Sequence, residues 1–356
     1  MKKHIILAVV LLCLTACNRN NAKFSGSATV PIAGFIDSTD MTNNFYDNTG
    51  TFTLPYGKIV VDGEIESPGE VDFSALPLRS VIVKETLLDS SAGGDRFTGA
   101  FRYDGYSLFD ILEKRMIKKK NAGEFGQIID MFVEVENEEG EKTVFSWGEI
   151  FYPNNLHKIL IATGVSRIVP SSTKELWTLP DKCKVVAAGD LITERNISNP
   201  VRITVKSFPV SFKVVRGMSP MYSSLIKIFH NRKPCGEISS IPGTFHKETF
   251  NTIFYGRGRG IHSTQPFTGV LVKEILGDYF PADGNNIKTG IMCIAGLDGY
   301  RCTVSYSEVF NRNDQQEFLL VQSAAGEDGG LFRIFAASDF FSDRAVKSLS
   351  EIHLGY

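Results

Sequence analysis

A glycine-rich basic stretch, FYGRGRGIHS at residues 254–263, holds residue types that suit an anion-binding loop. Arg257, Arg259 and His262 supply hydrogen-bond donors, and arginine presents them as a planar fork. The glycines between them let backbone N–H groups turn toward a bound oxyanion, because glycine adopts conformations that other residues avoid. The stretch therefore predicts a site for a phosphate, a carboxylate or a similar group. The alternative is a solvated loop whose arginines pair with nearby carboxylates, since surface ion pairs are common.

Four blocks of sequence recur in the same order along the chain. They are ALPLRSVIVKETLL and SSIPGTFHKETFNT; FRYDGYSLFDILEK and TQPFTGVLVKEILG; EVENEEGEKTVFSWGEIF and CIAGLDGYRCTVSYSEVF; KVVAAGDLITER and RIFAASDFFSDR. Internal similarity of this kind indicates a duplicated unit. It predicts two copies of one domain, residues 56–207 and 208–356. Each copy mixes short strands with short amphipathic helices, which predicts an α+β fold.

The last two blocks carry local signals for turns and helix starts. The third predicts a hairpin closed by Glu-Gly or Asp-Gly, followed by a Ser-x-x-Glu turn that could begin a helix. In the fourth block, Ala-Ala-x-Asp is followed at the same spacing by Arg195 in one copy and by Arg344 in the other.

The order of the blocks resembles the molybdopterin-binding domain of the sulfite oxidase family. The resemblance rests on VVDGEIESPGEVDFSALP at residues 60–77, on FTGVLVKEILG, and on Asp298-Gly299-Tyr300 followed by Ser305 and Glu308. It implies that each of the two copies has the family's α+β fold, and it implies a pterin-type cofactor (molybdopterin) and molybdenum-dependent oxidoreductase activity; the family's enzymes do not usually have two such copies in tandem. It also places the basic stretch at one wall of the cofactor site.

The same position in the first copy reads SAGGDRFTGAF, which adds an arginine to the predicted site. The predicted cofactor- or anion-binding residues are Arg96, Lys247, Arg257, Gly258, Arg259, Gly260 and His262. The family's enzymes hold molybdenum with a soft cysteine thiolate, and neither copy has a cysteine in the corresponding window. This difference favours an alternative function, a non-catalytic envelope interaction protein that has lost the cofactor.

The N-terminus predicts export and lipid anchoring. Residues 1–16 combine a basic start with an apolar run too short to span a bilayer, as in a signal peptide. The junction after them reads Leu14-Thr15-Ala16-Cys17, which resembles the bacterial lipobox and makes Cys17 the predicted lipidation site. The alternative is ordinary secretion after cleavage by a signal peptidase. Residues 17–55 are predicted to be a polar tether. Asn18 is not the aspartate that retains enterobacterial lipoproteins at the inner membrane, which favours the outer membrane, at its periplasmic or surface face.

Composition and cysteine content limit the kinds of partner, disulfide and metal site that we expect. Hydrophobic content of 43% and charged content of 22% are typical of a globular protein, and a pI near 6.3 gives no reason to expect nucleic acid. Cys293 and Cys302 flank the predicted turn and could form a disulfide, with buried thiols as the alternative. No cysteine and histidine spacing predicts a metal site. The expected partners are a lipid bilayer, a small anionic ligand or pterin, and, under the alternative function, another envelope protein.

Overall fold

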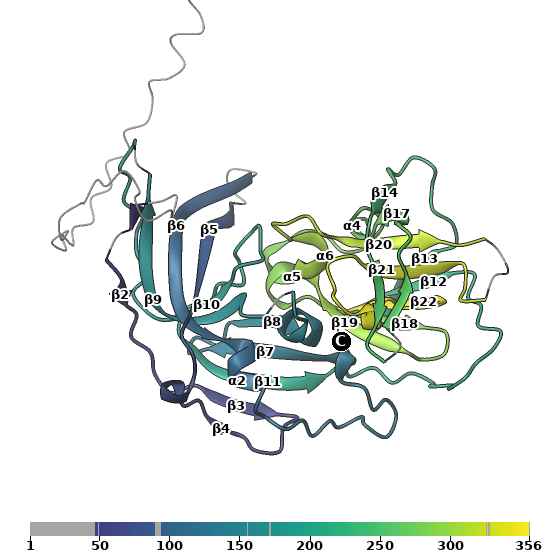
Figure 1. The fold of residues 1–356 in the computed structure, drawn as a ribbon, viewed down its shortest axis with the longest axis horizontal. Helices are drawn as coiled ribbons and strands as arrows, with labels where there is room; N and C mark the ends of the chain where they lie inside the picture. Colours follow the sequence, from purple (N-terminus) through teal and green to yellow (C-terminus); the bar gives the residue numbers. More distant parts are fainter. Residues whose placement is uncertain are drawn as a thin grey trace, which may run out of the picture. The chain divides into compact units, whose positions relative to one another are not determined.

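Four β-sheets and a separate two-stranded hairpin account for the strands of the structure (Figure 1). This computed structural model describes residues 47–48, 50–89, 94–154, 156–170, 172–258, 260–324, 326 and 328–355. They belong to one compact unit, residues 38–356.

The first half of the chain forms two sheets. One has the order β1-β9-β6-β5, with β2 and β10 also paired to β9, and the other has the order β4-β3-β11-β7-β8. The strands are β1 Asp47–Asn48, β2 Phe52–Thr53, β3 Val60–Gly63, β4 Gly69–Glu70, β5 Arg79–Asp89, β6 Gly94–Ser107, β7 Met131–Asn137, β8 Lys142–Ser146, β9 Ile159–Val169, β10 Lys184–Ala187 and β11 Pro200–Ser207.

The second half repeats this topology. Its sheets have the orders β13-β12-β22-β18-β19 and β14-β17-β20-β21, and β15 pairs with β16. In each half the first strand of the five-stranded sheet, β3 or β12, lies parallel to the last strand, β11 or β22. The strands are β12 Ile226–His230, β13 Lys233–Ile238, β14 Glu248–Phe250, β15 Phe254–Gly256, β16 Gly260–Ser263, β17 Phe267–Leu271, β18 Ile291–Gly296, β19 Arg301–Ser305, β20 Phe318–Gln322, β21 Phe332–Ala336 and β22 Leu349–Leu354. The repeated sequence blocks thus fall on equivalent strands.

The helices are short and follow the strands that the repeats predict. They are α2 Leu108–Leu112, α3 Trp147–Phe151, α4 Val272–Leu276, α5 Gly284–Thr289 and α6 Tyr306–Phe310, with 3-10 turns η1 Phe73–Ala75, η2 Ile128–Asp130 and η3 Ser342–Arg344. The predicted Ser-x-x-Glu signal is confirmed at α6, where Ser305 and Glu308 form a full capping box. At α3 the Ser146 hydroxyl accepts from the Glu149 N–H, but the Glu149 carboxylate turns elsewhere.

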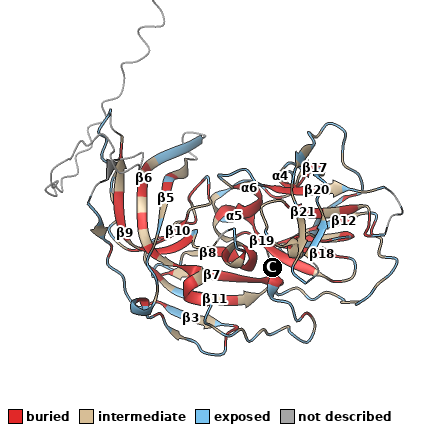
Figure 2. Cartoon of the chain, viewed as in Figure 1, coloured by how far each residue is buried: buried red, intermediate tan, exposed pale blue. Residues whose placement is uncertain are grey.

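The predicted α+β class, with two tandem sulfite-oxidase-like domains, is wrong. The chain is mostly β, 42% strand and 12% helix, and its small sheets are arranged like the blades of a four-bladed β-propeller. The amphipathic blocks do form helices, but each helix has only five or six residues. Much of the remaining apolar sequence forms strands covered on both faces, such as β18, whose residues are all buried (Figure 2). The predicted boundary between residues 207 and 208 lies inside the single compact unit and stays a prediction.

The C-terminal part of the predicted tether belongs to the folded body. Strands β1 and β2 pair with β9, and Leu54 is buried with its N–H donating to the Thr163 carbonyl. The predicted signal peptide and Cys17 lie outside the described residues. Within the described part of the chain, no helix is long and apolar enough to cross a membrane.

Candidate functional site

The basic stretch forms the β15–β16 hairpin, where Gly260 takes a left-handed φ of 74°. At its turn, Arg257 Nη2 lies 2.8 Å from Asp343 Oδ2, and its guanidinium lies 5.0 Å from the centre of the Phe341 ring. A local carboxylate therefore neutralises Arg257, and the ring covers part of it. This is the arrangement that the solvated-loop interpretation predicts.

The other predicted binding residues do not converge on one place. His262 is exposed on β16, with its ring edge-on to Phe254. Lys247 is exposed just before β14, and Arg96 is exposed on β6 in the other half of the chain. Gly258 lies in the exposed turn, and Arg259 is outside the described residues. Arg257, Gly258, Gly260 and His262 share the β15–β16 hairpin, whereas Lys247 and Arg96 lie on other elements.

A buried network of two arginines and four carboxylates lies between the halves. Arg195 donates to both carboxylate oxygens of Asp190, at 2.8 and 2.6 Å, and to both of Glu149, at 2.5 and 3.0 Å. In the second half, Arg344 donates to both oxygens of Asp339, at 2.7 Å each. The final member is Glu308, which accepts from Arg344 at 2.6 Å. We call this set the central network.

The two halves exchange hydrogen bonds within the central network. Ser146 Oγ, at the start of α3, donates to Glu308 Oε2 at 2.5 Å. Reciprocally, Ser305 Oγ, at the start of α6, donates to Glu149 Oε2 at 2.9 Å. Each half thus supplies a serine hydroxyl that donates a hydrogen bond to a buried glutamate of the other half. Sequence reasoning noted the recurring arginines and the Ser-x-x-Glu turns but did not bring them together.

Burial and the neighbouring charges shift the pKa values of the four carboxyl groups of the central network in different directions. Burial raises the pKa of Glu149, Asp190 and Asp339. Burial also acts to raise the pKa of Glu308, but the Arg344 charge and the Ser146 hydrogen bond outweigh it and lower that pKa.

The arginines of the central network remain charged. Burial acts to lower the pKa of both, but the charges of their carboxylate partners outweigh it and raise both values. The network therefore holds two fixed positive charges among four carboxyl groups, three of which have a raised pKa.

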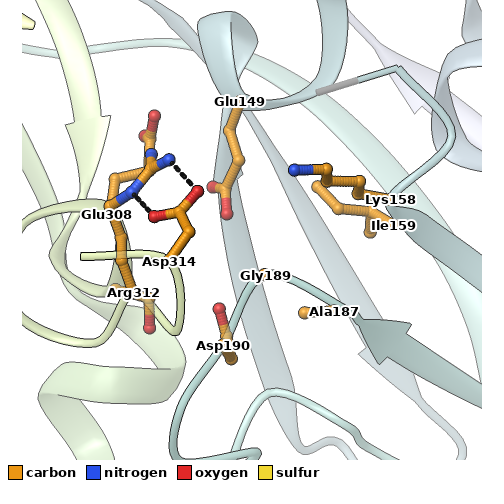
Figure 3. Close-up of a pocket in the computed structure, with 10 residues that line it drawn as sticks. Glu149, Lys158, Ile159, Ala187, Gly189, Asp190, Glu308, Arg312 and Asp314 are labelled. Carbon is orange, nitrogen blue, oxygen red and sulfur yellow. Dashed lines mark hydrogen bonds and ion pairs between the residues drawn. The ribbon is translucent and has the colours of Figure 1, made fainter. Parts of the chain in front are cut away.

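A cavity of about 30 Å³ borders the central network (Figure 3). Its lining residues are Glu149, Lys158, Ile159, Ala187, Gly189, Asp190, Ser307, Glu308, Arg312 and Asp314. Arg312 is held by Asp314 through two hydrogen bonds of 2.9 and 2.7 Å. A cavity of this size admits a water or two and no organic cofactor.

A second buried ion cluster also joins the halves. Asp130, which is fully buried, lies 2.7 Å from Lys119 Nζ and 3.0 Å from Arg301 Nε. Burial raises the pKa of Asp130 despite both cations. The Arg301 guanidinium lies between the rings of Phe125 and Phe212, at 4.5 and 5.1 Å from their centres. These contacts fix the position of β19 against the first half.

The cysteines form no disulfide among the four that the structure describes. Cys293 pairs in register with Thr303, and Cys302 with Ile294, so the two side chains point to opposite faces of the β18–β19 hairpin. The hairpin disulfide, which the sequence left open, is therefore excluded, and the alternative of buried thiols is confirmed for this pair.

The described residues do not fit molybdenum held by a thiolate. Burial raises the pKa of Cys183 to about 11 and also raises the pKa of Cys235, Cys293 and Cys302, so none of these four thiols is a preformed thiolate. In the described part of the chain, no cluster of three or more histidine, cysteine, aspartate or glutamate side chains could hold a metal ion.

No model of a known protein family matches the chain, and no curated protein matches it. The resemblance to the sulfite oxidase family therefore stays a prediction, and the fold that it implied is not observed.

Proposed function

We propose that the protein is a lipid-anchored component of a bacterial cell envelope that works through its surface as an interaction protein. The observation that carries this proposal is the central network, in which every arginine and carboxylate already has a partner from the chain itself. The cavity beside these pairs leaves room for little more than water.

Surface features support an interaction role. Ile253, Ile261 and Phe340, around the β15–β16 hairpin, are 55%, 62% and 49% exposed. Tyr255 ties these elements together, because its ring lies 5.7 Å from Phe340 and it pairs in register with Ile261. Exposed aromatic and aliphatic side chains with a neighbouring arginine are the composition of protein contact surfaces.

A second candidate function is the binding of a small anion by the same hairpin. It is favoured by the side chain of Arg257, which remains 57% exposed although it is paired with Asp343. An anion would have to compete with that carboxylate, so we expect weak binding. Titration with inorganic phosphate, followed by NMR of the wild type and of Arg257→Gln, tests this candidate.

Two measurements test the proposed function. A photo-crosslinking residue at Ile261 or Phe340 should give a discrete protein adduct in intact envelopes, whereas the same residue at Lys58, which is 81% exposed, should give none. In parallel, protein secreted by a host that makes molybdenum cofactor is assayed for molybdenum, tungsten and oxidised-pterin fluorescence. About one metal and one pterin per chain would refute the proposal, as would the absence of any adduct.

A further inference from the structure

A second exposed apolar patch lies on the first half of the chain, where β6 and the segment after β9 meet. Phe97 and Leu176 are 48% and 49% exposed. The Trp177 ring stands edge-on to Phe97, with ring centres 5.2 Å apart and planes at 85°. We call Phe97, Leu176 and Trp177 the rim patch.

The tryptophan of the rim patch is held rigidly in place. Its Nε1–H donates to the Ile168 carbonyl at 2.9 Å, and its own carbonyl accepts from Arg167 Nε at 2.5 Å. Gly99 packs so closely beneath it that an added Cβ would lie 2.7 Å from the Trp177 Cβ. The exposed aromatic surface is therefore preorganised, which lowers the entropy lost on binding.

The chain enters the fold beside the rim patch. Asn48 of β1 pairs in register with Ile168, the residue whose carbonyl accepts from Trp177. Residues 18–46 separate Cys17 from β1 in the sequence, and this length sets an upper limit on the distance between a lipid on Cys17 and the rim patch. A lipid on Cys17 would therefore keep the rim patch within that distance of the bilayer and at high effective concentration.

The chemistry of the rim patch suits a bilayer interface. Tryptophan and other aromatic side chains concentrate at the level of the lipid headgroups, where an apolar ring and a polar edge are both accommodated. The exposed charges beside Phe97 are balanced, with Asp95 and Arg96 adjacent in the chain. We therefore expect the contact to depend on apolar and aromatic burial more than on lipid charge.

We propose that the rim patch docks in the headgroup region of the phospholipid bilayer that carries the lipid anchor. This inference rests on the proposed lipid anchoring and adds a second point of contact. A lipid chain and an interfacial patch together anchor more firmly than one signal alone. With two points fixed, the folded body would take a defined orientation on the membrane.

Tryptophan fluorescence gives a direct test, because the chain has only two tryptophans. Trp147 is 5% exposed and packs on Phe151, so a quencher in the bilayer reaches Trp177 selectively. The full lipidated chain is placed in phosphatidylethanolamine–phosphatidylglycerol vesicles with or without brominated acyl chains. We expect bromination to reduce the Trp177 emission at least two-fold.

Matched variants separate docking from mere tethering. Phe97→Asp with Leu176→Asp should abolish the quenching, and Met116→Asp, at a residue 67% exposed elsewhere in the same half, should leave it unchanged. Circular dichroism confirms that each variant is folded. Absence of quenching in the wild type, equal quenching in the rim variant, or protection of Trp177 only when another envelope protein is added would overturn the inference. The mass of the N-terminal peptide is measured separately, because an unlipidated Cys17 would refute the proposed anchoring instead.

Discussion

Replacing Arg344 by methionine should destabilise the protein severely. The change removes a guanidinium that is fully buried and donates to both Asp339 and Glu308. These carboxylates are 1% and 2% exposed, so solvent cannot replace the lost donors. Breaking a buried ion pair from one side costs about 3–5 kcal/mol, which corresponds to a fall in Tm of roughly 4–8 °C for a chain of this size.

The loss of stability caused by Arg344→Met should be smaller at low pH than at high pH. Without the arginine, Asp339 loses the charge that opposes the effect of burial, and Glu308 keeps only its hydrogen bonds from Ser146 and the Ser305 N–H, so the pKa of both carboxyl groups should rise relative to the wild type. A carboxyl whose folded pKa is raised stabilises the fold when protonated, and this contribution is lost as pH rises through the folded pKa. The deficit relative to the wild type should therefore be smaller at pH 5 than at pH 7.5.

Urea unfolding at these two pH values measures both effects, with two comparison variants. Arg195→Met removes the equivalent arginine of the first half and should cost a similar amount. Arg202→Met removes an arginine that is 55% exposed and paired with Asp62, and should cost at most about 1 kcal/mol. If Arg344→Met were no more harmful than Arg202→Met, the central network would not have the energetic role assigned to it.

Three further changes test individual features. Burial raises the pKa of Glu149, so its protonation contributes stability at low pH and the cost of Glu149→Gln should grow from pH 7.5 to pH 5. The lowered pKa of Glu308 predicts that the cost of Glu308→Gln is constant over this range and shrinks below about pH 4.5. Urea unfolding measures both costs. Gly148→Ala would place a methyl 2.8 Å from the guanidinium carbon of Arg344 and should lower the free energy of unfolding by about 1–3 kcal/mol. Among the described thiols, Cys235 alone is exposed and should alone react rapidly with Ellman's reagent before unfolding.

Each of these expectations has a clear contrary result. Parallel pH profiles for the two glutamine variants would show that the two halves have equivalent electrostatics. Gly189, whose Cβ position faces open space, serves as the control glycine, and equal effects of alanine at both glycines would refute the steric argument. Rapid reaction of a second thiol would mean that Cys183, Cys293 or Cys302 is accessible.

Local features of the fold could be predicted from the sequence because they depend on neighbouring residues. The hairpin turn at Asp298-Gly299 forms with Gly299 at φ 80°, and the capping box at α6 forms from residues three apart. The repeated blocks fall on equivalent elements because equal sequence patterns fold equally. The class was wrong because a short amphipathic run fits one helical turn as well as a longer helix, and because fully buried strands show no alternation.

The central network could not be located from the sequence because its members meet only in three dimensions. Glu149 and Ser305 come from different halves and are joined by packing of α3 against β19. The available signal was the recurrence of Arg195 as Arg344, which marks equivalent positions without showing that they adjoin. The basic stretch suggested a binding site that the structure does not show, because the partner of Arg257 is Asp343 in η3, which is far along the chain and which no local sequence pattern connects to Arg257.

The reciprocal bonds from Ser146 to Glu308 and from Ser305 to Glu149 have a consequence for assembly. Each half offers the same donor and the same acceptor, so at these two bonds the halves meet as the subunits of an isologous interface do. Two identical chains, each the length of one half, would satisfy both bonds by facing each other across a twofold axis. A covalent link between such chains removes the need for association and frees each half to diverge, as the hairpin β15–β16 of the second half has done.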